Sequence, residues 1–176
     1  MIFLPYLMGT GSPHLDYSAR GSFVGLTPDH GKGELVRAIM EGVTMALRES
    51  LELAEEAGAE ITDLRLGAGA TRSDLWNQIQ ADIYGRPVHL VNTTDPSPLG
   101  AALLAGVGTE VYSDIEEAAE TAVNVTTRIE PEPSRRKIYD QLFQLFKEIY
   151  GQLRPSFPRL EDLAAKAETE EDQDQL

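Results

Sequence analysis

The residues best suited to bind a ligand lie in one short segment, Gly67-Ala-Gly-Ala-Thr-Arg-Ser-Asp74. Alternating residues before it predict a strand, and Thr71 or Ser73 can cap a helix after it. Small residues between a strand and a helix let a flat ligand approach the backbone, and the amides of a helix N-terminus attract anions. A nucleotide is the commonest ligand at such a place. Taken alone, such a segment is more often a plain, tight strand-to-helix turn than a ligand site.

Other kinds of chemistry find little support in the residue types present. The small-residue segment lacks the Gly-Lys-Ser/Thr of a Walker loop, and Arg72 stands where a dinucleotide fingerprint needs its third glycine. The chain has no cysteine, and no second His or Cys stands at metal-ligand spacing from any of its 3 histidines, His14, His30 and His89. A nucleophile elbow is missing around Ser12, Ser73 and Ser97. The sequence therefore predicts no metal site and gives no support for hydrolase chemistry.

Composition and charge narrow the range of partners. Asp and Glu number 29 against 15 Lys and Arg, which gives a net charge of −14. A surface this acidic repels the phosphate backbone, so we expect no nucleic-acid partner. The longest apolar run, residues 99–108, is far shorter than the roughly 18 residues that a membrane span needs. With no signal-peptide pattern and no cysteine, the sequence indicates a cytoplasmic protein without a membrane partner.

The elements around the segment alternate between strands and helices. A continuous apolar stripe at helical spacing predicts a helix over Glu34–Ala57, with Gly58 as its C-cap. The stripe consists of Val36, Met40, Val43, Leu47, Leu51 and Ala54, and it is widened by Leu35, Ile39, Ala46 and Leu53. So wide an apolar surface predicts that the helix is covered on more than one side.

The remaining elements follow from alternation, caps and breakers. Strands are expected at residues 21–26, 61–66, 87–91 and, at a sheet edge, 124–129. Further helices are expected from Ser73 to Gly85, over 99–107 after a Ser97-Pro98 cap, from Ser113 to Val123, and over 134–153. The last of these carries its apolar face on Ile138, Leu142, Leu145, Ile149 and Leu153. This order is typical of an α/β fold with a mostly parallel central sheet and flanking helices.

The chain divides into one domain and a tail. Residues 1–158 contain no Pro-, Gly- or Ser-rich linker and are expected to form a single domain. From Glu161 onward, seven acids and one base give the end of the chain a net charge of −6. We therefore expect residues 159–176 to form an acidic, disordered tail.

Several segments together resemble the C-terminal domain of the FGGY carbohydrate kinases. Gly21 to Glu41 matches that family's C-terminal signature, and residues 66–78 with Ala81-Asp82 resemble its adenosine-binding motif. Residues 99–102 resemble the small-residue helix start that follows. Within the family, residues 3–16 are most similar to xylulokinases, although Thr10, Gly11 and Ser12 replace their usual Glu-Arg-Thr. The resemblance spans roughly residues 3–154.

The resemblance implies an actin-like, ribonuclease-H-like fold in which two domains close around ATP and a sugar. It implies an ATP- and Mg²⁺-dependent kinase that phosphorylates D-xylulose to D-xylulose 5-phosphate. The aspartate base, most sugar contacts and the main magnesium-binding acids belong to an N-terminal half that is absent here, supplied in cis or by an adjacent gene. The abrupt apolar start of the chain agrees with this, so we expect the chain alone to be inactive.

The resemblance also assigns a nucleotide site. Gly67, Ala68, Gly69 and Ala70 are expected to form the wall beside the adenosine. Ser73 and Asp74, at the helix start, are expected to contact it through a side chain, whereas Asp82 is assigned to packing or the surface. Ala68 replaces the middle glycine of the usual Gly-Gly-Gly-Ala, a change that preserves close backbone approach if Ala68 keeps a negative φ.

Two alternatives remain open at this stage. In the first alternative, the chain belongs to a kinase whose substrate is another sugar or polyol, such as ribulose, gluconate or glycerol. Otherwise the chain is a non-catalytic nucleotide-binding or oligomerisation module, for which a homodimer would use the apolar faces of the helices over 34–57 and 134–154.

Overall fold

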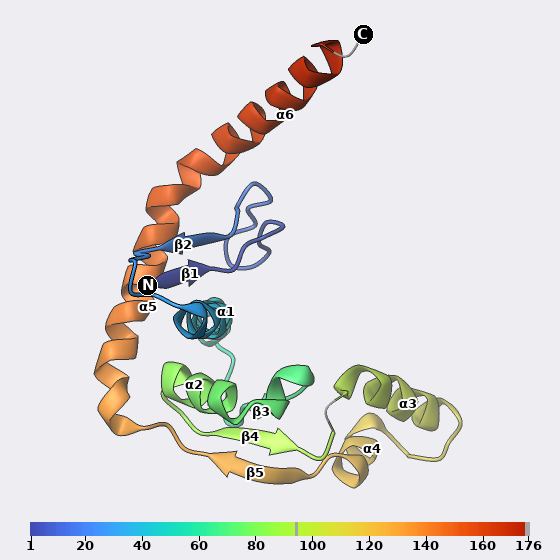
Figure 1. Cartoon of the computed structure of the whole chain (residues 1–176). Helices are drawn as coiled ribbons and strands as arrows, with labels where there is room; N and C mark the ends of the chain where they lie inside the picture. The colour runs from blue at the N-terminus through green and yellow to red at the C-terminus, as the bar shows by residue number, and fades with distance from the viewer. Residues whose placement is uncertain (94, 175–176) are drawn as a thin grey trace. The chain divides into compact units, whose positions relative to one another are not determined.

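The computed structural model describes residues 1–93 and 95–174, with side chains placed up to residue 167. Its tertiary contacts divide the chain into two compact units (Figure 1). The first unit combines Met1–Ala59 with the residues from Lys137 onward, and the second is Glu60–Arg136. The sequence indicated one domain over residues 1–158. Within that range the chain leaves the first unit and later returns to complete it, so no change in composition marks the boundary between the units.

The first unit is built on a short antiparallel strand pair and a long helix. Strand β1 (Ile2–Leu4) pairs with β2 (Ser22–Val24), which places Phe3 opposite Phe23. Helix α1 (Lys32–Glu56) packs on β1. Gly42 is required at this crossing, because a side chain there would collide with the carbonyl oxygen of Phe3. The predicted strand over 21–26 and helix over Glu34–Ala57 are confirmed, whereas β1 was not predicted.

Helix α5 (Pro133–Leu153) completes the first unit from residue 137 onward. Arg48 of α1 makes two contacts with this helix. Its guanidinium carbon Cζ lies 4.3 Å from the centroid of the Phe143 ring, and its Nη1 lies 2.9 Å from Asp140 Oδ1. The helix buries four aromatic residues, Tyr139, Phe143, Phe146 and Tyr150. The helix itself was predicted, but the predicted apolar face was wrong. Ile138 and Leu145 on that face are exposed, because the larger aromatic rings occupy the neighbouring face.

A polar cluster joins the two helices. Arg37 Nη2 donates to the hydroxyl of Tyr139 (2.9 Å), and that hydroxyl donates to Glu41 Oε1 (2.9 Å). Burial and the Glu41 carboxylate raise the pKa of Tyr139 to about 12. Glu41 therefore acts as a structural partner between α1 and α5.

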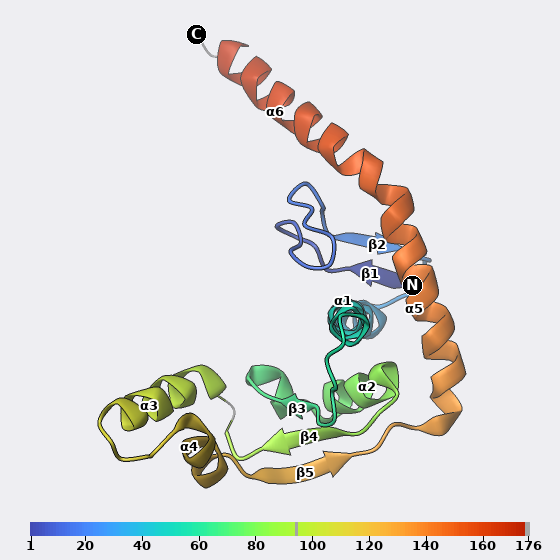
Figure 2. The same cartoon turned by 180° about the vertical axis from the view of Figure 1, so that it is seen from behind.

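The second unit contains a three-stranded sheet covered by a helix. The sheet order is β3 (Arg65–Leu66), β4 (Val88–Val91) and β5 (Val125–Ile129) (Figure 2). Strands β3 and β4 are parallel, whereas β4 and β5 are antiparallel. The expected α/β class with a central sheet and flanking helices is confirmed, and the part of the sheet described here is mixed, with one parallel and one antiparallel pair. Mixed sheets of this kind carry an antiparallel strand at the edge, where β5 lies with mostly exposed residues.

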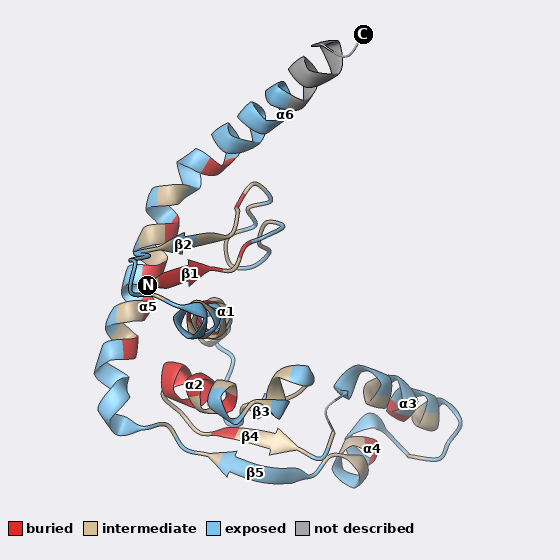
Figure 3. Ribbon diagram, in the orientation of Figure 1, coloured by how far each residue is buried: buried red, intermediate tan, exposed pale blue. Residues whose placement is uncertain are grey.

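The helix that covers the sheet begins and ends as its sequence predicts. A short 3₁₀ turn, η1 (Gly69–Arg72), leads into α2 (Asp74–Tyr84). Ser73 Oγ accepts a hydrogen bond from the Trp76 amide at 3.2 Å, and Gly85 closes the helix with φ of 64°. Helix α2 is largely buried (Figure 3). A side chain at Gly85 would displace the guanidinium of Arg136, which here donates to the carbonyl oxygen of Tyr84 at 3.1 Å.

Helices α3 (Pro96–Gly108) and α4 (Ile115–Ala122) connect β4 to β5. The predicted Ser97-Pro98 cap of α3 is wrong by two residues, because Pro96 itself takes the first helical position and Asp95 becomes the N-cap. At α4 the N-cap is Asp114, whose Oδ1 accepts from the Glu117 amide at 2.9 Å.

The end of the chain differs from its expectation. After the 3₁₀ turn η2 (Arg154–Ser156), helix α6 runs over Phe157–Asp174, where the sequence predicted an acidic, disordered tail. Pro158 lies in the first turn, where no amide hydrogen bond is needed, and the following Ala- and Leu-containing residues favour helix. Residues 175 and 176 lie outside the described residues. Among the helices described, none combines the length and apolar character of a membrane span.

One buried carboxylate fixes α2 to the segment that follows β5. Asp82 is 1% exposed. Its Oδ1 accepts from the amide of Glu132 and from Gln78 Nε2, both at 2.8 Å, and its Oδ2 accepts from Arg135 Nη1 at 2.9 Å. Of the two roles expected for Asp82, packing or surface, the structure shows packing: the buried carboxylate holds α2 to the residues that follow β5.

We expect Asp82→Asn to lower the free energy of unfolding by about 2 kcal/mol, because an amide removes the charge and places a donor beside donors. Urea unfolding followed by circular dichroism measures this. The exposed Asp162→Asn is the control and should change stability by less than about 0.5 kcal/mol. Equal effects of the two substitutions would show that Asp82 is no anchor.

Candidate functional site

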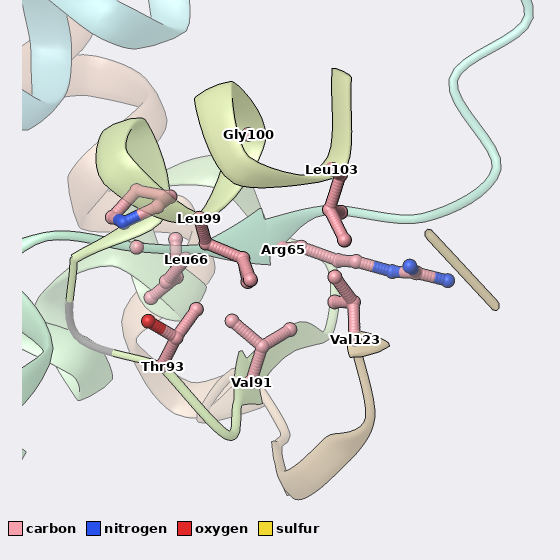
Figure 4. A pocket seen from close by; sticks show the side chains of 10 residues that line it. Arg65, Leu66, Val91, Thr93, Leu99, Gly100, Leu103 and Val123 are labelled. Carbon is pink, nitrogen blue, oxygen red and sulfur yellow. The ribbon is translucent and has the colours of Figure 1, made fainter. Parts of the chain in front are cut away.

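A cavity of about 280 Å³ lies at the carboxyl ends of β3 and β4 (Figure 4). Ten residues line it: Arg65, Leu66, Gly67, Val91, Thr93, Pro96, Leu99, Gly100, Leu103 and Val123. Parallel strands of α/β sheets place their ligands at this edge. The volume is near the lower end of small-molecule sites, and an apolar lining with few polar groups is typical of them.

The cavity is built from two strand ends and the first turns of α3. Leu99 and Leu103 of α3 lie on one side of the cavity. Leu66 and Val91, the last residues of β3 and β4, lie on the other side (Figure 4). The register explains the opening. Leu66, the last residue of β3, pairs with Leu90, and β4 extends one residue further to Val91, so the two strands end within one residue of each other. A flat, apolar ring fits such a slot better than a strongly charged group does.

Two glycines determine the shape of the slot. A side chain at Gly67 would lie 3.0 Å from Pro96 Cγ, so the strand end and the start of α3 approach as closely as glycine allows. A side chain at Gly100 would meet nothing within 4 Å, although Gly100 lines the cavity. The space beside Gly100 is therefore open.

Polar groups are few and lie at the rim. Thr93 Oγ1 accepts a hydrogen bond from the Asp95 amide at 3.2 Å. Arg65 Nε donates to Asp63 Oδ2 at 2.7 Å, and the Arg65 side chain is 54% exposed. The described lining contains no carboxylate, imidazole or thiol that could act as a base or nucleophile. Within the described part of the chain, no group of three His, Cys, Asp or Glu side chains could hold a metal ion. The site can bind and orient a ligand but supplies no reacting group of its own.

A second cavity, of about 260 Å³, lies at the opposite ends of the same two strands. Its polar lining includes Asp63, Arg86, His89 and Arg128. The Asp63 carboxylate accepts from Arg65 and is hydrogen-bonded to His89, and these contacts lower the pKa of Asp63. Because its charges are paired and it lies at the amino ends of the strands, this cavity is the weaker nucleotide candidate.

The predicted site residues are brought to this region, but only one of them lines the apolar cavity. That residue is Gly67. Ala68 and Gly69 are exposed, and Ala70 lies within η1. Ser73 caps α2 and already accepts the Trp76 amide, and Asp74 is exposed in the first turn. Contacts from Ala68, Gly69, Ala70, Ser73 and Asp74 to a nucleotide stay a prediction.

Sequence reasoning missed most of the lining. The resemblance of residues 99–102 to a family motif was a usable signal for Leu99 and Gly100. The strand predicted to end at Val91 indicated that a neighbour of Leu66 would share the same sheet edge. The remaining part of the lining is brought to the cavity only by tertiary packing, for which the sequence carries no local pattern. It includes Leu103, Thr93 and Val123.

The backbone at Ala68 departs from expectation. The residue has φ of 64° and ψ of −173°, so the condition that it keep a negative φ is not met. This conformation is essentially restricted to glycine and stores strain. The surrounding turn holds it in place: Ala68 O accepts from Thr71 Oγ1 at 2.8 Å, and Thr71 O accepts from the buried Asn77 Nδ2 at 2.9 Å.

Comparison with known proteins places the chain in a family. Residues 1–109 match the sequence model of the FGGY family of carbohydrate kinases, C-terminal domain. The chain therefore belongs to the FGGY family of carbohydrate kinases.

Individual relatives agree with this assignment. The xylulose kinase of Bacillus subtilis (strain 168) is 40% identical over 152 residues, which are 85% of this chain and 30% of the relative. A crystal structure of xylulose kinase from Rhodospirillum rubrum superposes with a TM-score of 0.74 at 32% identity, over 89% of this chain and 31% of that one. A crystal structure of gluconate kinase from Lactobacillus acidophilus superposes with a TM-score of 0.78 at 31% identity, over 90% of this chain and 32% of that one.

These findings confirm the predicted resemblance, the xylulose kinases among its relatives and the actin-like fold class. The chain spans about 30% of the length of the curated relative described above.

Ala68→Gly should raise the free energy of unfolding by about 1 kcal/mol, because relief of strain at positive φ exceeds the entropy that glycine adds to the unfolded chain. Chemical denaturation of the two proteins measures this difference. Ala70→Gly is the matched control, since Ala70 is not among the residues with positive φ, and it should lower stability. A loss of stability in Ala68→Gly would contradict the assigned strain.

Proposed function

We propose that the apolar cavity of the second unit binds the adenosine of ATP, and that the chain is the ATP-binding part of an FGGY sugar kinase. The proposed reaction transfers the γ-phosphoryl group to a hydroxyl of D-xylulose and yields D-xylulose 5-phosphate. The observation that carries the proposal is the slot between Leu66, Val91 and Leu99, at the carboxyl ends of two parallel strands. The family membership and the xylulose kinases among the relatives support the choice of reaction.

The residues of the slot fit the apolar part of a nucleotide. Leu66 and Val91 from the strands, and Leu99 from α3, would hold the purine ring between them. The open volume at Gly100 would receive an edge of that ring. In this arrangement the chain binds and orients ATP and excludes water from the purine, while its phosphates point away from the apolar lining.

The residues described here do not supply the rest of the reaction. Mg²⁺ would offset the charge of the triphosphate, and the described part of the chain holds no group of three candidate ligands for it. We expect the aspartate base, the metal ligands and most sugar contacts from the part of the kinase that this chain does not match. The chain covers about 30% of its xylulose kinase relative, which agrees with that division.

A second candidate concerns the sugar. The similarity to gluconate kinase from Lactobacillus acidophilus is as high as that to a xylulose kinase, so gluconate or a related polyol is the alternative substrate. A non-catalytic nucleotide-binding module is the alternative outside the kinase class. Turnover with D-xylulose, gluconate, ribulose and glycerol, measured after the missing part has been restored, distinguishes these three outcomes.

Gly100→Leu tests the site without disturbing the fold. A Cβ at this helical position meets nothing within 4 Å, so the backbone accommodates a leucine side chain beside the cavity lining. We expect it to weaken ADP binding to the chain by at least about tenfold, because it fills the volume required by the ring. Isothermal titration measures this. Gly108→Leu in the same helix is the control, since it too meets open space but lies outside the lining. Equal affinities of both variants would remove the cavity from the site.

Gly69→Leu tests the predicted loop separately. A side chain there would also meet open space, so a loss of ADP binding would arise from contact with the ligand. We expect weaker binding, by a smaller factor than for Gly100→Leu, because Gly69 lies outside the lining. Unchanged affinity would exclude Gly69 from the nucleotide site.

The chain by itself should show no phosphoryl transfer from ATP to D-xylulose above the uncatalysed background. The reason is that the described site holds no base and no cluster of metal ligands. A coupled assay for ADP release, with and without sugar, measures this. Robust sugar-dependent turnover would contradict the proposal that the base lies elsewhere.

A further inference from the structure

The second cavity, which we call the polar cavity, gathers basic side chains from three segments of the second unit. Its volume is about 260 Å³. Arg86 comes from the turn between α2 and β4, His89 from β4 and Arg128 from β5. Thr62 adds a hydroxyl, and Asp63 is the one acid of the described lining. With His89 neutral, two arginines and one aspartate give this lining a formal charge of +1.

This charge is opposite in sign to that of the chain as a whole. Asp and Glu number 29 against 15 Lys and Arg, so the chain carries a net charge of −14. A concave site lined by one sign of charge raises the local concentration of ions of the opposite sign. The polar cavity is therefore suited to an anion on a molecule that otherwise repels anions.

The register of the sheet places three bases side by side. Arg65 of β3 pairs with His89 of β4, and His89 pairs in turn with Arg128 of β5. Residues that are directly paired across strands point to the same face of a sheet. Val88, which precedes His89, is 0% exposed, so the three bases lie on the face turned away from the buried side. We call Arg65, His89 and Arg128 the basic row.

An anion beside the basic row is stabilising, because like charges directly opposite one another destabilise a sheet. Asp63 already serves as one such anion. Its Oδ2 accepts from Arg65 Nε at 2.7 Å, and its Oδ1 is hydrogen-bonded to His89. These contacts lower the pKa of Asp63, which shows that this place favours a negative charge.

The other end of the basic row is less well matched. Arg128 Nε donates to Glu130 Oε1 at 2.8 Å, but the two side chains are 59% and 63% exposed. An ion pair this exposed contributes little to stability. The contact engages only Nε, so both Nη groups of Arg128 are available to an oxyanion. A guanidinium fork binds two oxygens of a phosphoryl group at once.

We propose that the polar cavity is a binding site for a phosphoryl dianion, carried by a small phosphate monoester or free as inorganic phosphate. Arg128 and Arg86 bind the phosphoryl oxygens, and Thr62 donates from its hydroxyl. The site lies at the opposite ends of β3 and β4 from the apolar cavity, and it takes charge where the apolar cavity takes a ring. The proposal does not depend on the adenosine site proposed above.

Isothermal titration of the 176-residue chain tests the site. The probes are glycerol 2-phosphate and inorganic phosphate, with glycerol as the uncharged control, all at constant ionic strength. We expect saturable binding of the phosphate probes and none of glycerol. Tighter binding of glycerol 2-phosphate identifies a phosphate monoester as the ligand, whereas equal affinities identify free phosphate. Absence of binding by both phosphate probes would overturn the proposal.

Two substitutions should change the affinity for glycerol 2-phosphate in opposite directions. Arg128→Gln should weaken binding at least about fivefold, because it removes a charge-assisted contact. Asp63→Asn should tighten binding at least about threefold, because it removes a carboxylate that competes for the same cations. Arg159→Gln on α6 is the control, since it removes the same charge at an exposed position, and it should change the affinity by less than about twofold. Equal effects of Arg128→Gln and Arg159→Gln, or weaker binding in Asp63→Asn, would contradict the site.

A measurement on the unsubstituted chain keeps the test decisive if a variant fails to fold, as judged by circular dichroism. The chain has 3 histidines, so the ring resonances of His89 can be assigned by NMR from their loss in His89→Gln. We expect these resonances to shift on addition of glycerol 2-phosphate. Binding without such a shift would overturn the proposal.

Gly100→Leu separates this proposal from the adenosine site. That substitution lies at the apolar cavity, so it should change the affinity for glycerol 2-phosphate by less than about twofold. A loss of glycerol 2-phosphate binding in Gly100→Leu would assign the anion to the apolar cavity and overturn the proposal. A loss of ADP binding alone would leave the phosphoryl site intact, so the two proposals can fail separately.

Discussion

The parallel pairing of β3 with β4 is the constraint from which the candidate site follows. Both strands run in the same direction and end within one residue of each other, with Leu66 beside Leu90 and Val91 one residue further. The chain must then leave the sheet on the same edge twice, once through Gly67 and once through Thr93. Helix α3 lies over the two exits, held close by the contact between Gly67 and Pro96. An apolar slot at this edge results from topology before any catalytic residue is considered.

Local signals predicted the elements that surround the slot. The Ser73 cap, the Gly85 stop and the Gly42-containing helix each depend on nearby residues, so the sequence alone indicates them. The cavity lining depends on pairs of residues that are distant in sequence, such as Leu66 with Leu99. For the same reason the buried anchor Asp82 could be flagged only as a packing residue, because its partners Glu132 and Arg135 lie about 50 residues away.

Two expectations failed for a shared physical reason. Apolar periodicity predicted the inner faces of both α1 and α5, yet Leu47 and Leu145 are exposed. On α1 the backbone crossing at Gly42 determines the buried side, and on α5 the ring of Phe143 does. Periodicity detects that a helix has an apolar face but does not say which polypeptide covers it. Where a chain matches only part of its relatives' length, that distinction becomes decisive.

The central claim is that the slot between the strand ends and α3 holds a purine. A crystal structure of the chain with ADP tests it most directly. The account predicts the adenine ring between Leu66, Val91 and Leu99, with its edge at Gly100 and its phosphates outside the apolar lining. Adenine bound in the polar cavity lined by Asp63 and His89, or elsewhere on the second unit, would contradict it.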